Sequence, residues 1–161
     1  MRSPRKTQEE RLTIRKPGEI APETAIIFAA HELAVCAAYG LTIEEISSGK
    51  GTALVSTARA LAADLLRGKC SNWQRALVWQ VSPAAVVYSQ RQPSNEPRLF
   101  DTARKQALRY LADLQGALAA DLSGEKLTRA QKTSVAAVKE RAAQISEIID
   151  AARRGSVAES L

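Results

Sequence analysis

Apolar residues recur at helical spacing along most of the chain. The widest apolar face lies over residues 22–39 and predicts a central helix, with Pro22 suited to its first turn and Gly40 to a left-handed end. Residues 53–67 predict a second clear helix. Its apolar positions repeat every three or four residues, at Leu54, Ala58, Leu61 and Leu65.

Capping signals predict several shorter helices. Thr42 and Glu45 have the spacing of a capping box, in which each side chain accepts a hydrogen bond from the other residue's backbone amide. Ser71 is expected to cap a helix that reaches about residue 80. Ser82 followed by Pro83 is the next start signal, an N-cap serine with proline at the first helical position.

The last third of the chain carries a narrow seam of small and aliphatic residues. In the first part the seam comprises Ala107, Leu111, Leu114 and Leu118. After a capping box at Thr128 and Gln131 it continues through Gln131, Val135, Val138, Ala142, Ile145, Ile149 and Ala152. Alternating steps of four and three residues predict an antiparallel helical hairpin over 99–154. Neither helix can bury its seam alone, so the hairpin needs a partner surface, either the preceding domain or a second copy of the chain.

The whole chain is therefore expected to be all-α. Aromatic residues make up only 4% of it, so alanine and leucine must supply the core, and this favours closely packed helices over a β-sandwich. The expected divisions are a flexible basic arm, a helical domain, a proline-containing linker, the hairpin and a flexible tail. Their ranges are 1–19, 20–92, 93–98, 99–154 and 155–161.

The formal net charge of +6 is concentrated at the two ends. Residues 1–19 hold six Lys or Arg and three Glu, a net charge of +3, and residues 99–154 hold ten basic and seven acidic residues, again +3. Residues 20–92 hold six basic and five acidic residues, a net charge of +1. Such a balance permits contact with nucleic acid or another acidic surface, although solvated helices often carry the same count.

Residues with catalytic or metal-binding chemistry are sparse. His31, the single histidine, lies five positions before Cys36, a poor spacing for a metal site on one helix. Cys36 and Cys70 form no CxxC pair, so free thiols in a reducing cytoplasm are expected. The Gly-Lys-Gly-Thr run at 49–52 lacks the spacing of a phosphate-binding loop. We expect no enzyme activity, no metal and no cofactor.

The hydropathy pattern contains neither a membrane span nor a secretory signal. No apolar run reaches the roughly 18 residues that a bilayer requires, and the basic start is followed by polar residues. A cytoplasmic protein without a membrane partner is expected.

Residues 71–92 have the dimensions of a helix-turn-helix. A helix over 71–80, a tight turn and a helix over 82–92 would present the start of the second helix to the base edges of DNA. Spacing alone does not distinguish this arrangement from a helix pair in an all-α core. The apolar run over 83–87 also offers little hydrogen-bonding capacity.

Three motifs in this region are similar to those of one known family. Residues 39–46, YGLTIEEI, follow its pattern Y-x-(I/V)-x-x-x-(D/E)-(I/L), and residues 58–62, ARALA, follow A-R-x-(I/L)-A. Residues 82–86, SPAAV, take the place of its H-T-T-V recognition segment. The region over about 38–92 therefore resembles the C-terminal duplex-DNA-binding domain of the bacterial replication initiator DnaA. The resemblance implies a helix-turn-helix fold with affinity for duplex DNA.

Two departures bear on specificity. The family's Asp-His-Thr-Thr run is Ser-Pro-Ala-Ala here, and its arginine-rich loop retains only Lys50. The family's sequence specificity is therefore not expected. Arg59 corresponds to the family's arginine in the long helix, and contact with the DNA backbone, core packing and a salt bridge remain open for it.

The expected function is that of a DNA-binding regulator or accessory factor in transcription or replication, with low sequence specificity. The expected DNA contacts are Lys50, Arg59, Arg75, Ser82, Ser89 and Arg91, with the basic arm over 2–16 adding attraction to phosphates. Expected partners are double-stranded DNA and a second copy through the seam over 135–152. The alternative is a protein-interaction or adaptor domain that keeps the helical scaffold without DNA readout, and an enzyme or ligand binder is a third interpretation.

Overall fold

The computed structural model describes residues 19–86 and 97–159, and all regular structure within these ranges is helical. The helices are α2 (Pro22–Tyr39), α3 (Ile43–Ile46), α4 (Ala53–Leu65), α5 (Asn72–Trp79), α7 (Pro97–Leu122) and α8 (Arg129–Glu159). Residues 83–86 form a further helical turn. The all-α prediction is confirmed.

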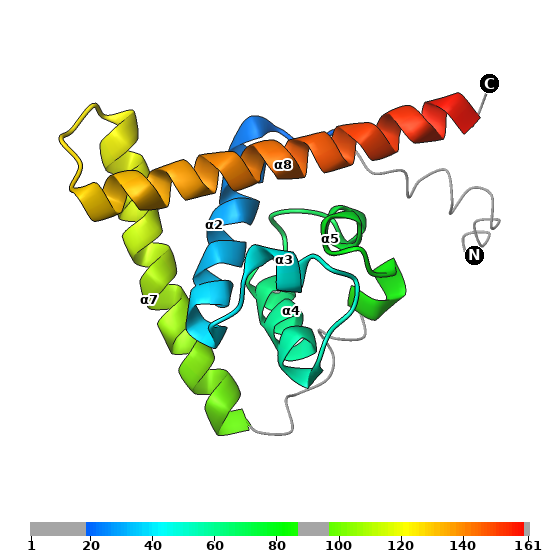
Figure 1. The fold of residues 1–161 in the computed structure, drawn as a ribbon, viewed down its shortest axis with the longest axis horizontal. Helices are drawn as coiled ribbons and strands as arrows, with labels where there is room; N and C mark the ends of the chain where they lie inside the picture. Colours follow the sequence, from blue (N-terminus) through cyan, green and yellow to red (C-terminus); the bar gives the residue numbers. More distant parts are fainter. Residues whose placement is uncertain (1–18, 87–96, 160–161) are drawn as a thin grey trace, which may run out of the picture.

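Helix α2 is the centre of the fold, as its wide apolar face predicts. It packs against α7 and α8 as well as α3 and α4, so side chains on nearly all sides of it are buried. Figure 1 shows α7 on one side of α2, α3 to α5 on the other, and α8 running across them. Alanine at 25, 29, 30 and 34 lets these neighbours approach closely, because it adds little bulk to the helix surface.

The predicted helix ends agree with the local capping chemistry. Gly40 ends α2 with a φ of 67°, and the Thr42–Glu45 capping box is present. The second box is present too, with the Gln131 amide donating to Thr128 Oγ1 at 3.1 Å. Helix α8 continues to Glu159, so residues 155–159 of the expected tail are helical.

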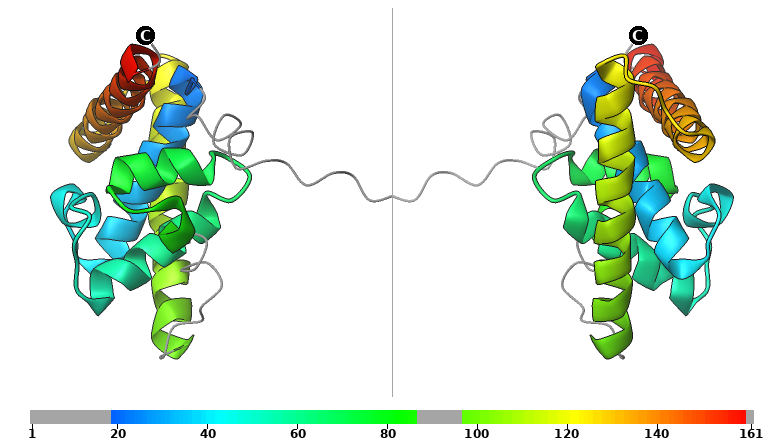
Figure 2. Two further views of the ribbon diagram at one scale, coloured as in Figure 1. Left: turned by 90° about the vertical axis from the view of Figure 1, so that its right-hand side faces the viewer. Right: turned by 90° about the vertical axis from the view of Figure 1, so that its left-hand side faces the viewer.

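Helices α7 and α8 do not form the predicted antiparallel hairpin. They cross near their connecting turn and then diverge (Figures 1 and 2). The physical reason is that both seams pack on α2. Six buried seam residues belong to the same core as Phe28 and Val35: Ala107 and Leu111 in α7, and Val138, Ala142, Ile145 and Ile149 in α8. Val135 is also buried but lies outside that core.

One hydrophobic core therefore spans both of the expected domains. It contains residues of α2, α4 and α5 together with those of α7 and α8. The seam over 135–152 was expected to be covered by the preceding domain or by a second copy, and its residues Val138, Ala142, Ile145 and Ile149 are covered by the preceding domain. In the part of the chain described here, no helix is both long enough and apolar enough to span a bilayer.

Candidate nucleic-acid interface

Helix α5 and the helical turn at 83–86 are joined by a tight connection. Ser71 caps α5, with the Gln74 amide donating to Ser71 Oγ at 3.1 Å and the Ser71 amide donating to Gln74 Oε1 at 3.0 Å. Gln80 ends α5 in the left-handed region with a φ of 56°. Ser82 then caps the next turn, accepting from the Ala85 amide at 3.1 Å. The predicted start signals at Ser71 and Ser82 are both confirmed.

Trp79 anchors the end of α5 in the core. Its side chain is 1% exposed and meets the Phe28 ring edge-on, with ring centroids 5.8 Å apart. Its indole Nε1 donates to Glu32 Oε2 at 2.9 Å. A buried indole N–H needs such an acceptor, and the bond fixes where the following turn leaves the core.

The loop between α3 and α4, residues 47–52, lies against this turn. Gln80 Nε2 donates to the Ser47 carbonyl at 2.7 Å. Gly49 has a φ of +73°, and a β-carbon added to it would lie only 2.6 Å from the Gln80 carbonyl oxygen. Glycine at 49 therefore permits both the backbone conformation and the close approach to Gln80. We call residues 47–52 and 80–85 together the loop–turn surface.

Two of the six predicted DNA contacts are exposed on the loop–turn surface. Lys50 lies in the loop and Ser82 begins the helical turn, and both are exposed. Ala84 and Ala85 are exposed beside Ser82. Their methyl groups carry no hydrogen-bonding group, and the Ser82 hydroxyl already accepts from a backbone amide.

Arg59 is placed in the interior, which corrects the prediction that it contacts DNA. The residue is 8% exposed. Its Nε donates to the Ile46 carbonyl at 2.8 Å, and its Nη2 donates to the Lys50 carbonyl at 2.9 Å. Of the three roles left open for it, the structure shows core packing, because these bonds satisfy the end of α3 and hold the loop in place.

Arg75 is also buried rather than presented on the surface, a second correction. It is 3% exposed, its Nη2 donates to Asn72 Oδ1, and its Nη1 approaches Cys70 Sγ at 4.0 Å. Its acceptor Asn72 lies three positions earlier on the same helix, so this bond stays within α5. Burial raises the pKa of the Cys70 thiol to about 11, so that thiol is protonated near neutral pH.

The remaining predicted contacts, Ser89 and Arg91, lie outside the described residues, as do residues 1–18 of the arm. The predictions made for them therefore stay predictions.

Sequence reasoning missed a buried ion pair beneath the loop–turn surface. Arg141 of α8 donates to both carboxylate oxygens of Glu32 in α2, each at 2.9 Å, and Glu32 is 0% exposed. Arg141 Nη2 also donates to Ser47 Oγ at 2.9 Å. Burial raises the pKa of Glu32, while the hydrogen bonds from Arg141 and Trp79 act against that shift. The one available signal was a glutamate on the helix predicted to be central, next to His31 and among mostly apolar residues.

Two other titratable groups of α2, His31 and Cys36, are held in the interior. His31 is 2% exposed, its Nδ1 lies 2.6 Å from the Ile27 carbonyl oxygen, and burial lowers its pKa. Burial raises the pKa of the Cys36 thiol to about 12. Within the described ranges, no group of three or more His, Cys, Asp or Glu residues is arranged to hold a metal ion.

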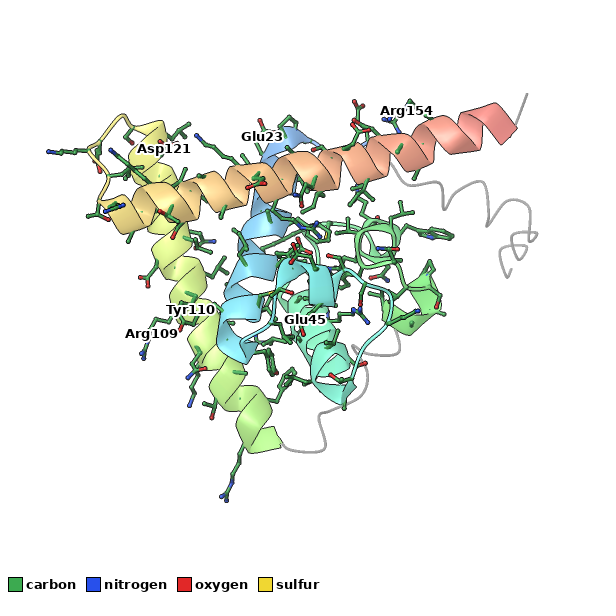
Figure 3. The ribbon with its side chains drawn as sticks, in the orientation of Figure 1. Glu23, Glu45, Arg109, Tyr110, Asp121 and Arg154 are labelled. Carbon is green, nitrogen blue, oxygen red and sulfur yellow. The ribbon has the colours of Figure 1, made fainter. Side chains whose placement is uncertain are left out.

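A hollow of about 400 Å³ lies on another part of the molecule, between α2, α7 and the start of α8. Alanine and leucine line most of it, with Tyr110 and Asp113 at its side. Figure 3 shows Arg109 and Tyr110 projecting from α7 on the side away from α4. The hollow is therefore separate from the loop–turn surface.

Comparisons of the chain with protein families, with curated proteins and with solved structures found no match.

Proposed function

We propose that this chain binds double-stranded DNA with low sequence specificity through the loop–turn surface, as a regulator or accessory factor in transcription or replication. The observation that carries the proposal is the contact between the 47–52 loop and Gln80. This contact places the loop that carries exposed Lys50 beside the turn that carries exposed Ser82. The resemblance of residues 38–92 to the duplex-binding domain of DnaA supports the same surface.

The chemistry of this surface suits phosphates better than bases. Lys50 supplies a mobile ammonium group, which attracts a phosphate as a point charge. Ala84 and Ala85 are small, so a DNA backbone can approach the polypeptide closely, but they offer no donor or acceptor to a base edge. Contacts to phosphate position a protein on the duplex without reading its sequence, which is why low specificity is proposed.

A salt-titrated binding assay on a random duplex tests the proposal. With fluorescence anisotropy, the logarithm of the affinity should fall linearly with the logarithm of the salt concentration. Lys50→Ala should weaken binding equally for unrelated duplexes and should reduce that slope by about one.

Lys126→Ala is the matched control for Lys50→Ala. Lys126 is exposed in the α7–α8 connection, and its replacement removes the same charge away from the loop–turn surface. It should leave the slope unchanged. Absence of binding at low salt, or an equal effect of the two substitutions, would overturn the proposal.

A second candidate function, a protein-interaction or adaptor domain, is favoured by the burial of Arg59 and Arg75. Both arginines contribute to the scaffold, which leaves Lys50 as the exposed basic residue among residues 47–52 and 80–85. A chain that is fully folded and yet does not bind duplex DNA at low salt would support this function.

A further inference from the structure

We propose that Arg141 is a positioning residue for the loop–turn surface: through this side chain, α8 sets where the loop over 47–52 and the turn over 80–85 lie relative to each other. This inference rests on the proposed function as far as DNA binding is concerned, but its structural part stands on the contacts of Arg141 alone.

The Arg141 side chain reaches from α8 to both α2 and the loop over 47–52. Its side chain is 6% exposed and binds Glu32 through two hydrogen bonds of 2.9 Å. The same guanidinium donates to Ser47 Oγ at 2.9 Å, across 94 positions of sequence. A planar guanidinium with several fixed donors holds three such contacts in one geometry, which a lysine ammonium does not reproduce.

Ser47 lies at the start of the loop. Ser47 Oγ accepts from Arg141 and donates to the Ile43 carbonyl at 2.7 Å. The Ser47 carbonyl accepts from Gln80 Nε2 at 2.7 Å. Ser47 is thus bonded to α8 through its side chain and to the turn after α5 through its backbone.

The turn after α5 is bonded to the same ion pair through a different residue, Trp79. Trp79, the residue before Gln80, donates to Glu32 Oε2, one of the oxygens that Arg141 also binds. Arg141 therefore holds the start of the loop, in addition to the bond that Arg59 makes to the loop, and Glu32 holds the turn. A change at this pair moves both segments relative to each other.

Burial explains why this pair serves position more than stability. Desolvation of two buried charges offsets much of their attraction, so a buried pair adds little net stability while defining a narrow geometry. The segments that it fixes include Gly49, where an added β-carbon would lie only 2.6 Å from the Gln80 carbonyl oxygen.

Arg141→Lys tests the inference because it keeps the charge and removes the planar fork. Arg154→Lys is the matched control, since Arg154 is exposed on the same helix and pairs with Glu147. In two-dimensional amide NMR spectra, Arg141→Lys should shift the signals of residues 47–51 and 79–82, and Arg154→Lys should not. Shifts confined to α2 and α8 would overturn the inference.

A double-mutant cycle with Lys50 gives the functional readout. Arg141→Lys should weaken binding to a random duplex about three- to tenfold, and should have no further effect once Lys50 is alanine. Additive losses would mean that Arg141 acts on stability alone and would overturn the positioning role.

Two further outcomes remain decisive. If Arg141→Lys fails to fold, Ser47→Ala removes the acceptor of Arg141 at the start of the loop, together with the Ser47 Oγ bond to the Ile43 carbonyl, and should produce the same NMR shifts and the same non-additivity. Unchanged spectra would overturn the inference. If the unmodified chain does not bind DNA, the proposed function fails and the NMR comparison alone decides the role of Arg141.

Discussion

Replacement of Arg141 by methionine should be among the most damaging single changes in the described part of this protein. Glu32 is 0% exposed and receives two hydrogen bonds from Arg141. Without the guanidinium the carboxylate stays buried with the Trp79 indole as its donor. Breaking a buried pair on one side costs about 3–5 kcal/mol, because the partner charge is left without compensation.

The double variant Glu32→Met/Arg141→Met should recover most of that loss. Removing both charges removes the desolvation cost as well, and apolar replacements of buried pairs are often neutral. The Trp79 indole then lacks its acceptor, so we expect a remaining cost of about 1–3 kcal/mol. Urea unfolding followed by circular dichroism measures both free energies of unfolding.

Arg154→Met is the control for this experiment. Arg154 and Glu147 are also 2.9 Å apart, but their side chains are 66% and 71% exposed, so the variant should lose at most about 1 kcal/mol. The reasoning is refuted if Arg141→Met lowers the free energy of unfolding by less than about 1 kcal/mol. It is also refuted if the loss in the double variant equals the sum of the losses in Glu32→Met and Arg141→Met.

Three further predictions concern His31, the two cysteines and Gly49. Burial lowers the pKa of His31, so the unfolded chain binds more protons than the folded one below about pH 6.5, and stability should fall as the pH decreases through that range. Thermal unfolding of the chain and of His31→Gln across pH 5–8 isolates this effect. Equal slopes of stability against pH for the two proteins would contradict it. Burial raises the pKa values of Cys36 and Cys70 to about 12 and about 11, so iodoacetamide should label these thiols slowly in the native protein at pH 8 and rapidly in denaturant. Equal labelling rates in the native and the denatured protein would show that the thiols are accessible. Gly49→Ala should destabilise the fold by about 1–3 kcal/mol, because it adds a clash with the Gln80 carbonyl to the strain of a positive φ. Gly124→Ala has a similar φ of +74° with open space around it and should lose only about 1 kcal/mol; equal losses in urea unfolding would show that the contact at Gly49 does not matter.

Local chemistry allowed much of the secondary structure to be predicted from the sequence. Thr42, Ser71 and Ser82 mark helix starts because their side chains satisfy backbone amides that lack a partner within the helix. Gly40 marks an end because it adopts the left-handed conformation without strain. These signals depend on residues a few positions apart, so they were readable without a fold.

The orientation of the long helices was not readable in the same way. The seam at Val138, Ile145 and Ile149 is buried as the sequence predicts. A seam specifies that a surface must be covered, but it does not specify which surface covers it. Both α7 and α8 pack on α2, and most of their buried seam residues belong to the core around it. The two helices cross instead of pairing along their length.

The roles of the arginines depended most on tertiary structure. Arg59 and Arg75 have the charge and position expected of DNA contacts, yet both turn inward to backbone and side-chain acceptors. Arg141 has no local feature that distinguishes it from the exposed basic residues of α8. Its role exists only because Glu32, 109 positions away in sequence, and Ser47, 94 positions away, are brought to its side. The sequence by itself determined where helices begin and end and which of their faces must be buried. The packing around α2 decided which charges are buried and which remain on the surface, because burial depends on neighbours that are distant along the chain.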